Sequence, residues 1–373
     1  MQLPPFKIES FQSLHKKSID YNLSAADAET LSLSELIDLA DNEVKELWNK
    51  CKLSYSSTEG HHLLRHEIAN LYGKMLNDKQ IITFAGAQEA IYATINTLIE
   101  KNDKVLVVAP TYQSLVELPI KIGAQVDIVN LEWRNNQFIL DENILLSLIT
   151  NDTKLIILNF PNNPTGYIPS KNFLYKIIEK ARKYNAYVLN DEVYQTPDKD
   201  PNSLPPVADL YDQGLSIGVL SKSLGLSGVR VGWLACQNQM VLDKILKRKH
   251  YLSICNGVVC ELLAIIGLRN KKQILKKNKN IIERNLKLLN DLFSNRQEII
   301  SWYQPKTGYL SFPKININWT AEDFSNKLLQ EEKILLLPSN LFDYGNKHLR
   351  FGFGKENLDV ALEKLDSFLT KYF

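Results

Sequence analysis

One segment of the chain places a lysine in a distinctive context: Ser221-Lys222-Ser223-Leu224-Gly225-Leu226-Ser227-Gly228-Val229-Arg230-Val231-Gly232-Trp233. A strand-like run, residues 216–220, leads into Lys222, and the next basic residue, Arg230, follows eight positions later. A lysine beside a fixed cation and away from bulk water favours its neutral form, because desolvation and the neighbouring charge both disfavour the ammonium. A neutral amine is the form that makes a Schiff base with a carbonyl cofactor. The segment alone leaves open a surface lysine beside a Gly-rich turn.

Apolar or β-branched runs alternate with helical stretches over residues 80–236. The seven strand candidates are residues 81–84, 104–108, 125–129, 154–159, 187–189, 216–220 and 231–236. Between them lie segments of helical periodicity, such as 89–99 and 171–184. Strands that alternate with helices favour a mostly parallel sheet with both faces covered. The sequence therefore predicts an α/β fold with a mostly parallel seven-stranded sheet flanked by helices, plus a smaller α+β domain.

The rest of the chain has a different character. Residues 241–292 read as long helix, and residues 34–47 read as one helix behind an irregular arm. Three short strand candidates follow the long helix: residues 310–313, 334–337 and 348–353. A chain of 373 residues exceeds what one compact core usually holds. We predict a large domain of residues 41–279 and a small domain formed by both termini, residues 1–40 and 280–373.

The bulk composition excludes several classes of protein. Hydrophobic residues make up 45% and charged residues 23%, which is ordinary for a soluble globular protein. A net charge of +2 gives no field strong enough to gather nucleic acid or an acidic membrane. The four cysteines show no C-x-x-C spacing and read as reduced thiols of a cytoplasmic protein. Residues 1–7 lack a signal-peptide pattern, and no apolar run approaches the roughly 18 residues of a membrane span. We expect neither nucleic-acid nor membrane partners.

Two further patterns have simple structural explanations. Five lysines occur within residues 271–279, but the interleaved Ile274 and Leu275 favour a solvated helix face over a nucleic-acid patch. His62 and His66 have the i, i+4 spacing of a helical metal site. No third ligand is evident, so we expect no metal.

Polar residues follow the strand candidates at the edge where open α/β sheets bind ligands. The first candidate leads into Gly86-Ala87-Gln88, a small-residue turn that opens a helix and suits a phosphate. A plain turn between strand and helix explains it equally well when taken alone. The second candidate is followed by Tyr112, whose ring can stack on a planar ligand.

Three more strand candidates end in polar side chains. Asn163 lies in a loop bracketed by prolines, Asp191 and Tyr194 lie three residues apart, and Lys222 follows the sixth candidate. Asp191 and the adjacent Glu192 point to opposite faces of a strand, so they would not share one metal ion. A phosphate cup, an aromatic ring, an amide, a carboxylate with a phenol, and an amine together fit a flat, phosphorylated pyridine aldehyde.

Seven motifs in fixed order carry a family resemblance: Tyr55-Ser56-Ser57-Thr58-Glu59-Gly60 with Leu64-Arg65, Gly86-Ala87-Gln88-Glu89, Pro110-Thr111-Tyr112, Asn163-Pro164-Thr165-Gly166, Asp191-Glu192-Val193-Tyr194, Ser221-Lys222 with Arg230, and Arg350-Phe351-Gly352. Over nearly its whole length the chain resembles the pyridoxal-phosphate-dependent aminotransferases of class I and II, which have the aspartate aminotransferase fold (fold type I). The cofactor that this implies is pyridoxal 5′-phosphate.

The resemblance implies a role for each residue around the cofactor ring. Lys222 forms the Schiff base (the internal aldimine) and later moves the proton between the substrate α-carbon and the cofactor. Asp191 pairs with the pyridine nitrogen and keeps it protonated, which makes the ring an electron sink. Facing that cation, Asp191 is expected to have a lowered pKa. Asn163 and Tyr194 form hydrogen bonds with the phenolic oxygen of the cofactor, and Tyr112 stacks on its ring.

The resemblance also implies the phosphate contacts. They come from a small-residue turn and an arginine: Gly86, Ala87, Gln88 and Arg230. Relatives often carry a phosphate-binding serine three residues before the lysine, and this chain has Val219 there. Ser221 or Ser223 would substitute for it, or the phosphate would have one donor fewer.

Substrate and subunit contacts follow in the same way. Arg350 matches the arginine that binds the substrate α-carboxylate, with Asn163 beside it. Tyr55 matches a tyrosine that reaches the phosphate from a neighbouring subunit. The resemblance therefore implies a homodimer with shared active sites.

The expected reaction is transamination between an L-amino acid and a 2-oxo acid. Segments 209–214 and 301–303 look similar to a subgroup with capreomycidine-synthase-like cyclases, so β/γ-elimination, replacement or cyclisation on the same cofactor stays an alternative. A catalytically idle effector domain of a regulator is a third hypothesis. No helix-turn-helix motif precedes the fold, which argues against it.

The sequence does not reveal the substrate side chain. The segments expected to meet it are residues 22–27, the loop after Tyr194, and residues 306–309. They match no specificity pattern.

Overall fold

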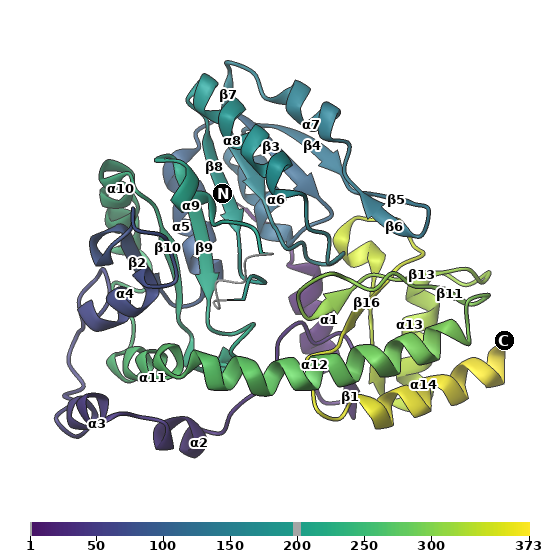
Figure 1. The fold of residues 1–373 in the computed structure, drawn as a ribbon. Coiled ribbons are helices and arrows are strands. Elements are labelled where there is room, and N and C mark those ends of the chain that lie inside the picture. The colour runs from purple at the N-terminus through teal and green to yellow at the C-terminus, as the bar shows by residue number, and fades with distance from the viewer. Residues whose placement is uncertain (1, 197–202) are drawn as a thin grey trace.

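The computed structural model describes residues 2–196 and 203–373. Its centre is a seven-stranded sheet of order β2-β10-β9-β8-β7-β3-β4 (Figure 1). The strands are β2 (Ile81–Phe84), β3 (Lys104–Ala109), β4 (Gln125–Asn130), β7 (Thr153–Leu158), β8 (Tyr187–Asp191), β9 (Gly214–Val219) and β10 (Gly232–Ala235). Only β10 runs antiparallel to its neighbours, so the predicted mostly parallel sheet and all seven strand candidates are confirmed.

Helices bury both faces of the sheet. In β3, Val105 and Val107 belong to one apolar cluster and Leu106 and Val108 to another, because successive side chains of a strand point to opposite faces. The first face is covered by α5 (Ala87–Leu98), α6 (Gln113–Ile122) and α10 (Gln239–Lys249). The second face is covered by α7 (Glu142–Leu148) and α8 (Lys171–Tyr184).

The ends of α8 show how local sequence sets the boundaries of these helices. The Ser170 side chain accepts a hydrogen bond from the Phe173 N–H and so satisfies a free donor of the first turn. Arg182 and Lys183 lie in the last turn, where positive charge opposes the helix dipole. Asn185 then ends the helix in a left-handed conformation, with a φ of 55°.

The remaining α-helices precede β2 or follow β10 in the chain, apart from the short α9. They are α1 (Lys7–His15), α2 (Leu33–Asp38), α3 (Asn42–Asn49), α4 (His62–Ala69), α9 (Val207–Leu210), α11 (Val258–Arg269), α12 (Lys271–Ser294), α13 (Ala321–Glu332) and α14 (Leu358–Tyr372). Figure 1 shows α12 running from α11, beside the sheet, to α14 in the C-terminal part. One long helix thus joins the two parts of the molecule.

Two segments that were each predicted as one helix are divided into shorter helices in the structure. The helix predicted over residues 34–47 is broken into α2 and α3, because the Asp41 side chain accepts from the Val44 N–H and starts a new helix. The helix predicted over residues 241–292 is divided into α10, α11 and α12. Residues 250–257 separate the first two, with Ile254 in a left-handed conformation (φ 66°), and Asn270 separates the last two.

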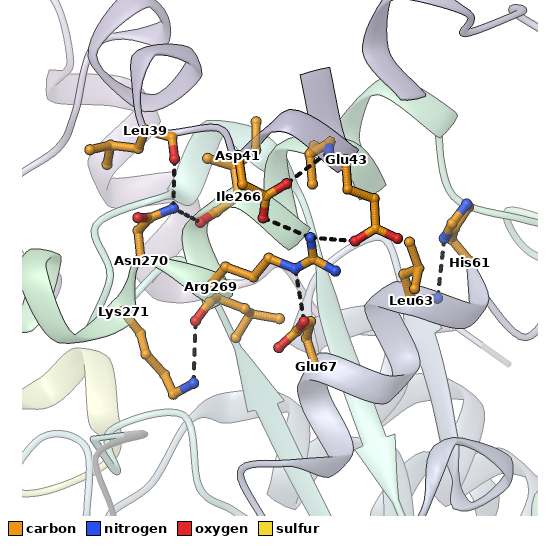
Figure 2. A network of polar contacts seen from close by, with 12 residues as sticks. Leu39, Asp41, Glu43, His61, Leu63, Glu67, Ile266, Arg269, Asn270 and Lys271 are labelled. Carbon is orange, nitrogen blue, oxygen red and sulfur yellow. Dashed lines mark hydrogen bonds and ion pairs between the residues drawn. The ribbon is translucent and has the colours of Figure 1, made fainter. Parts of the chain in front are cut away.

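An ionic network fixes the junction that the sequence missed (Figure 2). Arg269 at the end of α11 pairs with Asp41 at 2.7 Å, Glu43 at 2.9 Å and Glu67 at 2.9 Å. The neighbouring Asn270 donates to the Leu39 carbonyl at 3.0 Å. These contacts tie α3, α4 and the end of α2 to one end of α11.

The C-terminal part is built from short strands and two helices around its own apolar cluster. Its strands pair as β12-β16-β15, β11-β13 and β1-β14. They are β1 (Tyr21–Asn22), β11 (Ile300–Ser301), β12 (Leu310–Ser311), β13 (Lys314–Ile315), β14 (Ile334–Leu335), β15 (Leu337–Pro338) and β16 (Leu349–Gly352). A separate hairpin joins β5 (Glu132–Arg134) and β6 (Gln137–Ile139). Leu23 from the N-terminal arm packs with α13 and α14 in this cluster.

Within residues 2–196 and 203–373, no helix is long and apolar enough to cross a membrane. The same residues contain no group of three or more His, Cys, Asp or Glu side chains placed to hold a metal ion. All four cysteines are free thiols.

Candidate active site

A cavity of about 580 Å³ lies at the carboxyl ends of the parallel strands, between the sheet and β16. It collects ten of the twelve predicted site residues: Ala87, Gln88, Tyr112, Asn163, Asp191, Tyr194, Ser221, Lys222, Arg230 and Arg350. They come from positions as far apart as 87 and 350, so the fold brings together side chains that the sequence separates widely.

Gly86 lies behind this group, at the start of α5. Its φ is 94°, a conformation that favours glycine, and a Cβ there would lie 2.6 Å from Nη2 of Arg230, so a larger residue would displace the guanidinium. Arg230 Nη1 donates to the Ser227 carbonyl at 3.0 Å, and no ion pair forms at Arg230 within the described residues. A helix N-terminus beside a guanidinium without a carboxylate is a suitable site for a phosphate.

The serines near the lysine divide between two places. Val219 and Ser221 line the cavity, whereas Ser223 is buried and borders a separate void of about 60 Å³. Ser221 is therefore the one that can substitute for the serine that relatives carry. Ser227, which we did not predict, contributes a further hydroxyl-bearing side chain to the wall.

Asp191 ends β8 with its carboxylate buried in the cavity wall. Burial raises the pKa of Asp191 to about 6, and a hydrogen bond from the Val193 N–H and the charge of Lys222 lower it by less. The lowering expected beside a protonated pyridine nitrogen stays a prediction; among this chain's own groups, desolvation outweighs the charge of Lys222. Sequence shows which charges are near but not how deeply a carboxylate is buried.

Asn159 is a positioning residue that sequence reasoning missed. Its Nδ2 donates to the Asp191 carbonyl at 2.9 Å, and its Oδ1 accepts from the Asn163 N–H at 2.8 Å. It thus fixes the backbone of two predicted site residues. The available signal was a polar residue at the end of the apolar strand candidate 154–159.

Arg350 is buried with an unused donor. Its Nη1 donates to Asn163 Oδ1 at 3.1 Å and its Nη2 to the Ser24 carbonyl at 2.8 Å. Its Nε is buried with no hydrogen-bond partner among the residues that the structure describes. Burial lowers the pKa of Arg350. A buried donor without a partner is rare and marks a place for an external acceptor, such as a carboxylate.

Lys222 extends from the turn after β9 toward Tyr194. Its Nζ lies 5.3 Å from the centre of the Tyr194 ring, and its carbonyl accepts from the Ala28 N–H at 3.0 Å. Gly225 lets the chain turn close to the arm, because a Cβ there would lie 1.9 Å from the Glu29 carbonyl oxygen. The lysine is thus anchored between the sheet and the N-terminal arm.

The N-terminal helix closes one side of the cavity, which the sequence did not indicate. Four residues from its start line the wall: Phe6, Ile8, Glu9 and Gln12. The Tyr112 hydroxyl donates to Glu9 Oε1 at 2.9 Å, and the Phe6 ring centre lies 4.8 Å from that of Tyr112. Burial raises the pKa of Tyr112, and the charge of Glu9 adds to that effect.

The three segments expected to meet the substrate side chain have different outcomes. The arm does line the cavity, through Asn22, Ala25, Ala26 and Asp27. Residues 306–309 do not belong to the wall, and Tyr309 packs in the apolar core. In the loop after Tyr194, residues 197–202 lie outside the described residues.

Tyr55 is the one predicted residue that lies away from the cavity. Its side chain is 87% exposed, in a loop held by a hydrogen bond from Ser56 Oγ to the Asn256 carbonyl at 2.8 Å. The single chain therefore does not bring Tyr55 to the other site residues.

Glu192 points away from Asp191, as the strand geometry predicts, and yields a test of stability. Its Oε1 accepts from Asn190, Val207 and Ser216 at 2.9 to 3.2 Å. Burial raises the pKa of Glu192 to about 8 from an ordinary value of 4.5, so the folded state keeps a proton that the unfolded state loses. The contribution of Glu192 to the free energy of unfolding is fully present below pH 4.5, and it is lost as the pH rises to about 8.

The free energy of unfolding of Glu192→Gln should therefore fall less than that of the wild type as the pH rises. Glutamine keeps the accepting oxygen and imitates the protonated acid, so the free energy of unfolding should shift in its favour by on the order of 4 kcal/mol between pH 5 and pH 8. Denaturant unfolding at both pH values measures this difference. Glu179→Gln, on the exposed face of α8, is the control. Parallel pH profiles for wild type and Glu192→Gln would refute the assignment.

Comparisons with known proteins show the family of this chain. A model of the family "Aminotransferase class I and II" matches residues 19–365. An aspartate aminotransferase of Thermotoga maritima is 27% identical over 374 residues, covering 96% of this chain and 94% of the relative. A probable N-acetyl-LL-diaminopimelate aminotransferase of Bacillus subtilis is 28% identical over 336 residues, covering 85% and 82%.

Solved structures are also similar over the full length. A PLP-dependent aminotransferase from Streptococcus suis 89-1591 has a TM-score of 0.93 and 33% identity, covering 100% of this chain and 99% of that chain. The PLP-dependent cyclase OrfR has a TM-score of 0.89 at 24% identity, with the same coverage, which shows a shared fold. The chain belongs to the class I and II aminotransferase family.

Proposed function

We propose that this protein is a pyridoxal-phosphate-dependent aminotransferase that moves an amino group between an L-amino acid and a 2-oxo acid. The observation that carries the proposal is the buried Arg350 with its unused Nε, in the same cavity as Lys222 and Asp191. An arginine so placed binds a carboxylate bidentately. Family membership supports the same reaction.

The residues fit the cofactor. The N-terminus of α5 and the Arg230 guanidinium, which a residue larger than glycine at position 86 would displace, hold the phosphate. Ser221 and Ser227 lie on the same wall and offer hydroxyl donors in place of the serine that Val219 replaces. Asp191 holds the pyridine nitrogen, and Tyr112 covers the ring.

The remaining groups act on the substrate and its protons. Bound pyridoxal 5′-phosphate supplies an electron sink for bond breaking at the α-carbon. Asn163 and Tyr194 orient the ring oxygen, and Asn163 also holds Arg350 in place through Oδ1. Arg350 and Asn163 bind the α-carboxylate. The Lys222 amine would take the proton from the substrate α-carbon and deliver it to the cofactor.

An amino-acid panel tests the reaction type. The holoenzyme is mixed with each L-amino acid without an acceptor, and the products are quantified. A transaminase releases one equivalent of 2-oxo acid per site and no ammonia. Ammonia release marks elimination, and a cyclised amino acid marks a cyclase. Elimination also forms a 2-oxo acid, so either ammonia released together with the 2-oxo acid or a cyclised amino acid would overturn the proposal.

We also propose a homodimer in which Tyr55 reaches the phosphate of the partner subunit. The exposure of its ring and its place in a loop outside the cavity support this assignment. Removing its hydroxyl in Tyr55→Phe should weaken cofactor binding by about 1.5–3 kcal/mol, the value of a hydrogen bond to a charged group. Absorbance titration of the apoenzyme with the cofactor measures this loss.

Subunit mixing decides between shared and separate sites. In a dimer of one Lys222→Ala subunit and one Tyr55→Phe subunit, shared sites give one site with both defects and one with neither. Mixing should therefore raise activity above the Tyr55→Phe level. Mixed dimers that form and recover nothing would show that Tyr55 acts within its own chain or not at all.

Two further assignments stay proposals. The first is the division into a large domain, 41–279, and a small domain of both termini, supported by Leu23 of the arm packing with α13 and α14. Leu36 of α2 packs instead beside α11, which favours a boundary ahead of α2. The second is a cytoplasmic location, supported by the four free cysteines.

A further inference from the structure

The N-terminal helix and arm supply the part of the cavity wall that no proposed cofactor or carboxylate contact uses. On α1, Glu9 and Gln12 are three residues apart and therefore share a helix face. On the arm, Asn22 and Asp27 also line the wall. A substrate held by Arg350 through its α-carboxylate has its side chain free to extend toward these polar groups.

The charged side chains of the described cavity wall that the proposed function leaves unused are all acidic. Within the described residues, the cations that line the cavity are Lys222, Arg230 and Arg350, and the proposed function uses all three. The acids that remain are Glu9 and Asp27. A distal carboxylate on the substrate would therefore meet Glu9 and the ion-paired Asp27, and no cation in the described part of this chain that the proposed function leaves unused.

The two acids differ in their availability. Asp27 is paired with the Lys355 ammonium at 3.1 Å, and the same ammonium donates to the Ala28 carbonyl at 2.8 Å. Glu9 accepts one hydrogen bond, from the Tyr112 hydroxyl to Oε1, and has no ion pair within the described residues. Its Oε2 is thus free to accept from a ligand, while Tyr112 fixes the direction of the carboxylate.

Glu9 and Arg350 line the same cavity. Burial lowers the pKa of Arg350, and the charge of Glu9 is among those that oppose this shift. The carboxylate that would face the substrate side chain and the guanidinium that would hold its α-carboxylate therefore act on the same cavity. A cation at the distal end of the substrate side chain would pair with Glu9, whereas an anion there would be repelled by Glu9.

We propose that the substrate is an L-amino acid whose side chain ends in an ammonium or guanidinium group, and that Glu9 is the residue that selects it. This rests on the proposed aminotransferase function and names its substrate class. Glu9 accepts from the distal cation, and Gln12 and Asn22 offer neutral polar contacts around it. The same carboxylate disfavours aspartate as a substrate. This differs from the printed name of one relative, an aspartate aminotransferase that is 27% identical.

Lysine and norleucine form a matched pair for the test, because their side chains differ by the terminal ammonium alone. The wild-type holoenzyme should favour lysine, or ornithine or arginine, over norleucine and aspartate by about 10-fold or more in kcat/KM, since a charge-assisted bond contributes roughly 1.5–3 kcal/mol. Glu9→Gln keeps an oxygen for the Tyr112 hydroxyl but removes the charge. It should lower the lysine-to-norleucine ratio of kcat/KM by about 10-fold, mainly through KM.

A second measurement reports binding without turnover. Calorimetric titration of the cofactor-loaded Lys222→Ala variant, with and without Glu9→Gln, gives Kd for lysine and norleucine. The lysine preference in Kd should fall about 10-fold with Glu9→Gln. Glu179→Gln, an exposed acid on α8 far from the cavity, controls for net charge and should leave both ratios unchanged.

The outcomes separate the two proposals. If no amino acid releases a 2-oxo acid, the proposed function fails, and the binding ratios still decide the role of Glu9. If transamination occurs but aspartate or norleucine is preferred over lysine, the substrate class is wrong. If Glu9→Gln weakens lysine and norleucine equally, Glu9 only supports Tyr112 and does not select the side chain.

Discussion

Replacing Lys222 by alanine is expected to abolish turnover, with a loss of roughly 10⁴-fold or more. Under the proposed function, the variant loses both the amine that bonds the cofactor and the base that moves the α-proton. It should still bind the cofactor weakly, because the α5 N-terminus, Arg230 and Asp191 remain in the cavity. Steady-state release of 2-oxo acid measures turnover, and absorbance titration measures the retained binding. Lys176→Ala, on the exposed face of α8, is the control for losing a lysine.

A chemical test identifies the lysine directly. Borohydride reduction of the holoenzyme followed by peptide mapping should place the pyridoxyl group on Lys222. Lys249 is the informative competitor, since burial lowers its pKa to about 8. Its amine, however, donates to the Thr58 and Thr83 carbonyls, each at 2.6 Å, and to Asn256 at 3.1 Å, so we expect no label there. A label on any lysine other than Lys222 would refute the assignment.

The sheet was predictable because its strands are short, apolar and separated by helices of clear periodicity. Strands such as β3 and β7 are buried on both faces, and that burial leaves a continuous apolar run in the sequence. Breaks within helical regions were harder to see. Asp41 interrupts a helical pattern through one side-chain cap, and the turn at residues 250–257 contains Ile254, which rarely adopts a positive φ. Tertiary contacts settle such positions, and periodicity does not show them.

The candidate site was predictable where chain order and topology suffice. Residues that follow parallel strands meet at one edge, so the sequence alone places Tyr112, Asn163, Asp191 and Lys222 together. Glu9 could not be placed in this way, because its position depends on how α1 docks across the sheet edge.

The raised pKa of Asp191 shows a second limit. The charge of Lys222 lowers the pKa of Asp191, but desolvation is the larger effect and decides the direction, and burial is a property of the folded packing. The unused Nε of Arg350 has the same origin. The sequence motif indicates that Arg350 belongs to the site. That its Nε has no hydrogen-bond partner among the described residues is visible only once the surrounding residues are in position.

Asp191→Ala should reduce turnover on the order of 10²–10³-fold while weakening cofactor binding far less. In the role proposed for it, the carboxylate keeps the pyridine nitrogen protonated, so its loss would remove charge stabilisation where electrons accumulate during the reaction. The phosphate contacts at Arg230 and α5 do not involve it, and they retain most of the binding energy. Asp191→Asn gives the sharper comparison, since it keeps an oxygen for the Val193 N–H and removes only the charge.

Glu192 is the matched control for this prediction, because it is the adjacent buried carboxylate and points away from the cavity. Glu192→Gln should change the pH dependence of stability, because the raised pKa is lost with the carboxyl group, yet leave kcat within a few-fold of wild type. The pair therefore separates the effect of altering a buried carboxyl group from the effect of altering the one that faces the proposed cofactor. If Asp191→Asn and Asp191→Ala turned over at near-normal rates, the ring would not depend on this carboxylate. The position of Asp191 at the end of β8 would then serve packing, and another group would have to hold the pyridine nitrogen.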